Sequence, residues 1–565
     1  MGQPCYGLSA LALALGLLSS SCSTAPPAAS LVQPTSDSTS RTAGPSSSLT
    51  ADQRILHVLN RLGYGPRPGD LERVRRMGLE HYVAQQLNPQ QVADLATDQA
   101  LASYRTLAMS TPNLVREYRQ LTAEARRKRA DGEMSSQEMM EAFPPDRRPG
   151  RILSEMQAAK VTRAMLSERQ LEEVMVDFWL NHFNVYARKG PLPWMLPSYE
   201  RDAIRPYALG RFRDLVVATA RHPAMLYYLD NWLSTRADLV VLTGPKRGSL
   251  LGLNENYARE LMELHTVGVD RGYSQHDVIE VARAFTGWTI DRPLQGGGYV
   301  FRPRSHDQGQ KIVLSQVIPA GGGEQDGLRV IDVLTRHPST ARFVSTKLVK
   351  RFVSDDPPSQ LVARVATVFR RSDGDIRSVL AAIFSSPEFF SADAYRSKIK
   401  TPLEVVISAA RAVDARLDPV ATVNDQLSGG ASTLARQIAR LGEPLYEAPP
   451  PSGYPDSAAA WVNTGALVGR MNFALALTQA RLPGVRVDLT PILDGTDPRQ
   501  PQEVLDRLIT AALHGEVTSE TRSILEAELD SPEIRRAITY DRAPRRTDAE
   551  KLAALVLGAP EFQRR

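Results

Sequence analysis

Apolar side chains recur every three to four residues over much of the chain, which is the spacing of helices that bury one face. The clearest example runs from Asn254 to His265. One half of its helical wheel holds Tyr257, Ala258, Leu261, Met262, Leu264 and His265. A second such segment begins at the capping-box pattern of Ser274 and Asp277 and ends near Gly287. The pattern predicts two amphipathic helices joined by a short turn, with Asn254 as the N-cap of the first.

The polar half of the first wheel has two interpretations. Glu255, Arg259 and Glu263 stand four residues apart, which is the spacing of a solvated ion-pair ladder. This interpretation is favoured, because charges on a helix usually face water. In the alternative, the stripe of Asn256, Glu260 and Glu263 faces a cleft. Its two carboxylates could then hold a divalent metal or share acid–base chemistry.

Two histidines lie in apolar or aromatic surroundings. His182 follows Asn181 within the aromatic segment 178–186. A packed core role is favoured there, and the alternative is a His at a pocket wall that Asn181 orients. His265 lies in the apolar half of its wheel, where a hydrogen-bonded core His is more frequent than a ligand.

The pattern changes after Trp288, where two short extended runs are separated by a polar segment. We expect a minor β-hairpin near residues 298–315, with His306 and Asp307 at its tip. A His-Asp pair on a loop suits a functional site, and Asp and Gly are also ordinary turn formers.

Taken together, the periodicity predicts a mainly α, irregular multi-helix globular body from about residue 51 to residue 565. Two helical lobes could meet near residues 395–405. The polar segment 121–151 and the Pro-rich segment 443–456 are expected to be loops or insertions.

The N-terminus differs from the rest of the chain and predicts export. Leu8–Leu18 is an apolar run that is short for a membrane span and typical of a signal peptide. It ends in three Ser residues and Cys22, which resembles a lipoprotein processing site, although the preceding Leu stands one place early and the start lacks Lys and Arg. We expect residues 1–22 to be a signal peptide and Cys22 to be a lipidation site, which would anchor the chain to a membrane. Residues 23–50 are rich in Ser, Thr, Pro and Ala, which favours a disordered tether.

Composition narrows the possible chemistry. The net charge is +5, from 68 Lys and Arg against 63 Asp and Glu, and the two signs are interspersed. No concentrated basic stripe is present, so nucleic acid is not an expected partner. Cys5 and Cys22 are the two cysteines, so the mature fold has no disulfide and no Cys-based metal or redox site. A haem protein is disfavoured, because no CxxCH sequence occurs.

Several sequence words occur together in a fixed order: FWLNHFNV, LNENYARELMELHTVGV, YSQHDVIEVARAFTGW, HDQGQK, KIKTPLEVV and GEPLYEAPPPSGYPD. They resemble the bacterial domain-of-unknown-function 1800 family over nearly all of residues 51–565. The resemblance implies an exported, largely helical protein without an established activity. It also implies an exported partner of the alkaline-phosphatase/sulfatase type. The family's strongest words contain Asn181, His182, Asn254, Glu255, Arg259, Glu260, Arg283, His306 and Asp307.

Two functions follow as hypotheses. The first is a cell-envelope hydrolase in which His182, Glu260, Glu263, His306 and Asp307 converge in one pocket. His182, Glu260 and His306 would be the catalytic groups, and a divalent metal is a candidate cofactor. The supporting residues would be Asn181, Asn254, Glu255, Arg259, Glu263, Arg283 and Asp307. The second hypothesis is a non-catalytic lipoprotein that binds another exported protein through segments 121–151 and 443–456. In both cases we expect an outer-membrane or periplasmic lipoprotein, or a secreted protein.

Overall fold

Several helices begin at residues whose side chains cap the first helical turn. In the computed structural model, Thr50 and Gln53 form a capping box at the start of α1 (Ala51–Arg61). Thr401 and Glu404 do the same for α18 (Pro402–Ala412). Each box satisfies two backbone N–H groups that the first helical turn leaves without a partner.

The structure describes residues 48–565 except 133–137, 139–146, 149, 241–251, 270, 428–432, 498, 530 and 532–545. The predicted signal peptide, Cys22 and residues 23–47 of the tether therefore lie outside the described residues. The described residues belong to one compact unit, Ser47–Arg565. The lobe boundary near 395–405 stays a prediction.

The fold is mainly α, with a few short antiparallel strand pairs, as the periodicity predicts. The N-terminal part of the described chain contains α1, α2 (Asp70–Met77), α3 (Leu79–Leu87), α4 (Leu95–Leu101) and α5 (Thr111–Ala130). The middle of the chain adds α9 (Leu192–Ser198), α10 (Phe212–Arg221), α11 (Pro223–Tyr228), α12 (Asn256–Glu260), α13 (Gln275–Ala284), α14 (Glu324–Arg336), α15 (Pro338–Phe352), α16 (Ser359–Arg371) and α17 (Ile376–Phe384). The C-terminal part contains α18, α19 (Pro419–Leu427), α20 (Leu434–Arg440), α21 (Thr464–Thr478), α22 (Pro501–Leu513), α23 (Ser519–Leu529) and α25 (Arg546–Gly558).

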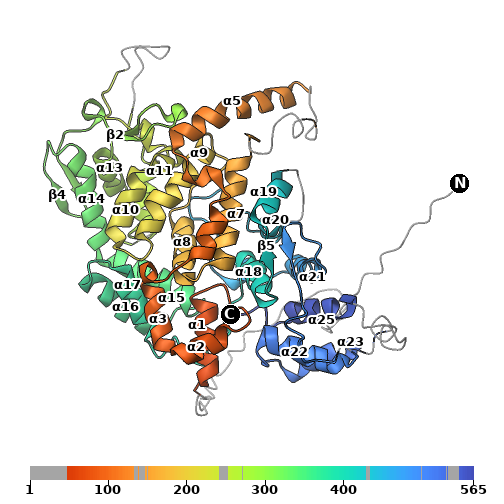
Figure 1. Ribbon diagram of the computed structural model, residues 1–565. Coiled ribbons are helices and arrows are strands. Elements are labelled where there is room, and N and C mark those ends of the chain that lie inside the picture. The colour runs from red at the N-terminus through yellow and green to blue at the C-terminus, as the bar shows by residue number, and fades with distance from the viewer. Residues whose placement is uncertain are drawn as a thin grey trace, which may run out of the picture. The chain divides into compact units, whose positions relative to one another are not determined.

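Two helices, α7 (Arg151–Leu166) and α8 (Gln170–His182), lie side by side at the centre of Figure 1. Most of their side chains are buried, on all sides of each helix. A helix that is buried all round belongs to the interior of a large body. Neighbouring elements cover the pair, and α18, α19 and α20 contact α7.

The two amphipathic helices predicted for residues 254–265 and 274–287 are present, but the first of them begins and ends differently from the prediction. The first α-helix, α12, begins at Asn256, and its N-cap is Glu255 instead of the expected Asn254. The Asn254 side chain still accepts a hydrogen bond from the Asn256 backbone N–H at 2.9 Å. After Glu260 the helix widens into a π-helix, η7 (Leu261–His265). The capping box of Ser274 at α13 is confirmed.

The β-structure near 298–315 differs from the expected single hairpin. β2 (Tyr299–Phe301) pairs back with β1 (Trp288–Ile290), and β3 (Lys311–Val313) pairs forward with β4 (Gln316–Ile318). His306 therefore lies in the connection between two hairpins and not at a tip. The reason is local, because Leu314 and Ser315 both adopt positive φ. Such a two-residue turn matches strand twist and lets β3 fold directly onto β4.

No helix in the described part of the chain is long and apolar enough to cross a membrane.

Candidate functional site

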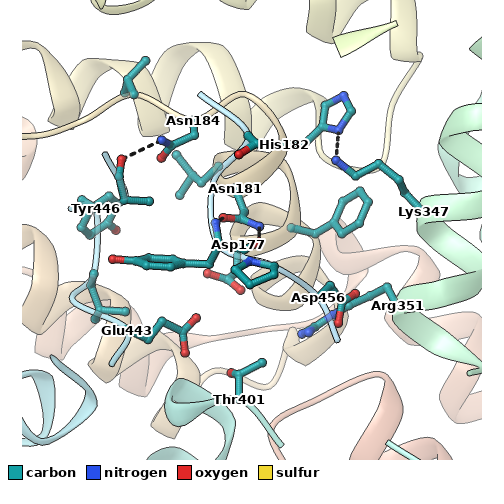
Figure 2. A pocket seen from close by; sticks show the side chains of 18 of the residues that line it. Asp177, Asn181, His182, Asn184, Lys347, Arg351, Thr401, Glu443, Tyr446 and Asp456 are labelled. Carbon is teal, nitrogen blue, oxygen red and sulfur yellow. Dashed lines mark hydrogen bonds between the residues drawn. The ribbon is translucent and has the colours of Figure 1, made fainter. Parts of the chain in front are cut away.

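A pocket of about 340 Å³ opens between α7, α8, α15 and the segment from Glu443 to Asp456 (Figure 2). This volume is sufficient for a small organic ligand. Its ionisable side chains are Lys160, Asp177, His182, Lys347, Lys350, Arg351, Glu443, Tyr446, Tyr454 and Asp456. Aromatic rings from Phe178, Phe343, Tyr446, Tyr454 and Trp461 also line it.

His182 ends α8 and is held by both of its ring nitrogens. Nε2 lies 3.0 Å from the backbone oxygen of His265, and Nδ1 lies 2.9 Å from Nζ of Lys347. A carbonyl oxygen can only accept, so Nε2 carries the hydrogen and Nδ1 accepts from the lysine. Burial, followed by the positive charge of Lys347, lowers the pKa of His182 well below its usual value. The imidazole is therefore neutral.

The π-helix η7 explains why the His265 carbonyl is available. The last carbonyls of a helix have no partner within it, and the backbone turns away at Thr266, with φ −130° and ψ −88°. The His265 ring is buried against Phe183, with centroids 5.0 Å apart. Its Nε2 has no hydrogen-bond partner among the described residues. His265 is thus a core residue, as favoured from the sequence, and it contributes its backbone to the site.

Lys347 is the cation at this end of the pocket. Its ammonium lies 5.6 Å from the Phe343 ring centroid, and burial lowers its pKa to about 8. Among the described residues, no carboxylate lies within 4.0 Å of it. Asp456 acts on it from a greater distance, and that carboxylate is paired with Lys398 at 3.2 Å.

Two carboxyl groups with unlike surroundings line another part of the pocket. Asp177 is ion-paired with Lys160 at 2.5 Å. Glu443 is buried and accepts one hydrogen bond, from the Leu403 N–H at 2.8 Å. Burial and the negative charge of Asp177 raise the pKa of Glu443 to about 8. The pocket thus holds an uncharged carboxylic acid near an ion-paired carboxylate.

Two asparagines of the α8 region hold the Pro-rich segment over the pocket. Asn181 accepts from the Tyr454 N–H at 2.7 Å and donates to the Tyr454 oxygen at 2.8 Å. Asn184 donates to the oxygens of Ala448 at 2.9 Å and Pro450 at 2.8 Å. The expectation that Asn181 orients His182 is therefore wrong. Successive residues on a helix point about 100° apart, so Asn181 faces the segment while His182 faces α15.

Tyr446 adds a strained backbone next to Glu443. Its φ is +64°, which is uncommon for a bulky residue. Its hydroxyl donates to Glu200 at 2.7 Å. Burial opposes the charge of Glu200, yet Arg163 and Arg205 lower its pKa to about 2. The Glu200 carboxylate thus holds the Tyr446 hydroxyl in place. A positive φ at a bulky residue is a form of backbone strain that often marks functional sites.

Most of the sequence-predicted site residues lie elsewhere. Arg259 contacts Glu255 at 3.4 Å and Glu263 at 3.5 Å, so the ion-pair ladder is confirmed. Glu260 is half-buried, and burial followed by the charge of Glu263 raises its pKa. These residues and Asn254 are absent from the pocket lining.

His306 belongs to a separate, fully buried cluster. Its Nδ1 lies 2.8 Å from the Thr286 oxygen and its Nε2 lies 3.2 Å from Asp326. Lys311 donates to the same carboxylate at 2.7 Å. This cluster joins the connection between the hairpins to α14.

Asp307 points to a different partner, Arg283, which donates to both of its oxygens at 2.9 and 3.0 Å. Of the residues expected to converge, the pocket is lined by His182 and not by Glu260, Glu263, His306 or Asp307. The expected convergence is therefore not found, because each of the other groups meets partners in its own region. Catalytic roles for Glu260 and His306 stay predictions.

Within the described ranges, no three His, Cys, Asp or Glu side chains are grouped as ligands for an ion.

Asp177, Glu443 and Lys347 line the pocket but were not predicted from the sequence as site residues. One signal was present, since Asp177 is a charge inside the strongly apolar run Val174–Leu180. Glu443 stands at the start of the Pro-rich segment. Polar groups in such surroundings are costly unless they are paired or used.

The family model described as "Protein of unknown function (DUF1800)" matches residues 57–564. No curated protein and no solved structure gives a significant match. The chain therefore belongs to the domain-of-unknown-function 1800 family, over nearly its whole length.

Proposed function

We propose that the protein is an exported hydrolase that cleaves glycosidic bonds in a cell-envelope polymer. The observation that carries this proposal is the pair of carboxyl groups in one pocket, Glu443 and Asp177. Two carboxyl groups with opposite protonation states are the usual machinery of glycoside hydrolysis.

The surroundings of each group favour one role. Glu443 is buried with a single backbone donor, so it keeps its proton near neutral pH and can act as the general acid. Asp177 forms an ion pair with Lys160 and lines the same pocket, so it can act as the base. In Figure 2 both side chains point into the same pocket.

The proposed reaction needs water as its only co-reactant. Glu443 gives its proton to the leaving oxygen as the bond to the sugar carbon breaks. Asp177 takes a proton from the attacking water, whose oxygen forms the new bond to that carbon. Transfer of the proton from Asp177 back to Glu443 through solvent restores the starting state.

The experiment measures reducing ends released by the purified protein from a panel of neutral and acidic polysaccharides and from peptidoglycan. We expect release from at least one substrate. Loss of one member of an acid–base pair typically slows the reaction by about 10²–10⁴-fold, and we expect losses of that size for Glu443→Gln and Asp177→Asn.

The matched control is Glu447→Gln. Glu447 lies in the same segment but contacts Arg188 and Gln157 outside the pocket, so its neutralisation should leave turnover unchanged. Full activity in both pocket variants would contradict the proposal. If the protein hydrolyses nothing in the panel, the hypothesis of a non-catalytic lipoprotein that binds another exported protein is favoured instead.

A further inference from the structure

The four cations of the pocket differ in their partners. Lys160 is paired with Asp177 at 2.5 Å, and Arg351 is paired with Glu404 at 2.9 Å. Lys347 and Lys350 also line the pocket, and neither has a carboxylate within 4.0 Å among the residues that the structure describes. Two positive charges therefore face the cavity without a counter-ion of their own.

Helix geometry places these two lysines together. They are three residues apart on α15, so they project from the same face of the helix. Figure 2 shows Lys347 at the α15 side of the pocket, pointing toward His182. His182 accepts from one N–H of the ammonium, which leaves two donors for a ligand.

The imidazole fixes the ammonium without neutralising it. His182 is itself held by the His265 carbonyl, so the Lys347 amine has a defined position at the wall. A partly buried ammonium without an anion is unfavourable, and the lowered pKa of Lys347 reflects this cost. A bound anion would remove that cost.

The remaining lining suits the rest of a sugar ring. Tyr454 and Trp461 lie with ring centroids 6.1 Å apart, and both line the pocket. Aromatic rings offer flat apolar surfaces, while Asp177 and Glu443 offer hydrogen-bonding groups to hydroxyls.

We propose that Lys347 and Lys350 form an anion subsite, which makes the pocket specific for an acidic sugar. The negative group of that sugar, a carboxylate or a sulfate ester, lies between the two ammonium groups. This inference deepens the proposed hydrolase function and rests on it for the identity of the reaction. The binding step can be measured separately.

The experiment uses saturation-transfer NMR or titration calorimetry with three monosaccharide probes, namely glucuronate, glucose 6-sulfate and glucose. None of them contains a bond for the enzyme to cleave, so binding is observed apart from catalysis. We expect both anionic probes, or one of them, to bind at least about tenfold more tightly than glucose, because a hydrogen bond between two charged groups is stronger than one to a neutral hydroxyl. The probe that binds better identifies the anion as carboxylate or sulfate.

Lys347→Met and Lys350→Met should each weaken binding of the anionic probe by about tenfold or more and leave glucose binding unchanged. Lys350→Met provides a second test if Lys347→Met disturbs the packing around His182. The control is Arg342→Gln, which removes an exposed charge from the same helix outside the pocket.

Two results would overturn the inference: binding of both anionic probes no tighter than that of glucose, or unchanged binding of the better anionic probe in both lysine variants. The outcomes also separate the two proposals. Glucuronate binding without hydrolysis of any polymer would reject the hydrolase and keep the anion subsite. Hydrolysis of neutral polymers alone would keep the hydrolase and reject the anion subsite.

Discussion

At the scale of single residues, Glu443 and Lys347 show one cause acting on opposite charges. Burial disfavours the charged form of each group, so it raises the pKa of the carboxyl to about 8 and lowers that of the amine to about 8. Groups with pKa values near neutrality exchange protons readily under physiological conditions. Burial of these two groups therefore costs stability.

This cost leads to a prediction for Glu443→Gln. Below pH 4.5 both the folded and the unfolded Glu443 are protonated, and between pH 4.5 and 8 the folded state alone keeps the proton. Wild-type stability should thus fall as pH rises through this window. The variant lacks this dependence, so its unfolding free energy relative to wild type should increase by up to about 3 kcal/mol from pH 4.5 to pH 7.

Urea unfolding at the two pH values checks the effect. Glu447→Gln serves again as the control, because Glu447 is ion-paired with the exposed Arg188 and does not line the pocket. If the difference between Glu443→Gln and wild type is the same at both pH values, the environment assigned to Glu443 is incorrect.

At the scale of elements, the pocket depends on how α8 holds the segment from Glu443 to Asp456. The contact consists of side-chain amides bonded to backbone groups of the segment. Gly453 permits the approach, since a Cβ atom there would lie 2.2 Å from Oδ1 of Asn181. These bonds order a Pro-rich segment that has little regular structure of its own.

We predict that Asn181→Ala and Asn184→Ala loosen this segment while the helices stay folded. Each substitution removes two hydrogen bonds, which should destabilise the protein by about 1–3 kcal/mol. Hydrogen exchange of the backbone amides of residues 443–456 should become faster. The proposed hydrolysis of glycosidic bonds should slow, because Glu443 is no longer held in position. Asn472→Ala on the exposed side of α21 is the control. Unchanged exchange in both variants would show that the asparagines do not hold the segment.

At the scale of the whole molecule, buried ion pairs join distant segments beside the pocket. Glu404 lies 2.9 Å from Arg351 and 3.0 Å from Arg565. Lys398 contacts Asp355 at 2.5 Å and also reaches the pocket carboxylate Asp456. Buried charges require partners, so this network ties α15, α18 and the last residues of the chain to one arrangement.

The compartment is also a property of the whole chain, and we propose export with a lipid anchor at Cys22. In a bacterial host, the full-length protein should incorporate a labelled fatty acid and fractionate with membranes. Cys22→Ser should abolish the label, and Cys5→Ser should not. Labelling that persists in Cys22→Ser would contradict the anchor.

Local information in the sequence determined much of the fold. Periodicity and caps depend on neighbours within one or two turns, so they predicted the helical class, the ion-pair ladder around Arg259 and the capping box at Ser274. For His182 a packed core role is favoured by the sequence and a pocket wall is the alternative; the side chain is buried among aromatic rings and also lines the pocket.

Tertiary structure alone decided which groups meet. Asp177, Lys347 and Glu443 are far apart along the chain, and no local pattern encodes the burial or the distances that give them their properties. The pairing of β3 with β4, in contrast, depends on the local turn at Leu314 and Ser315. The sequence therefore determined the helices, while the packing of remote segments selected the pocket and its chemistry.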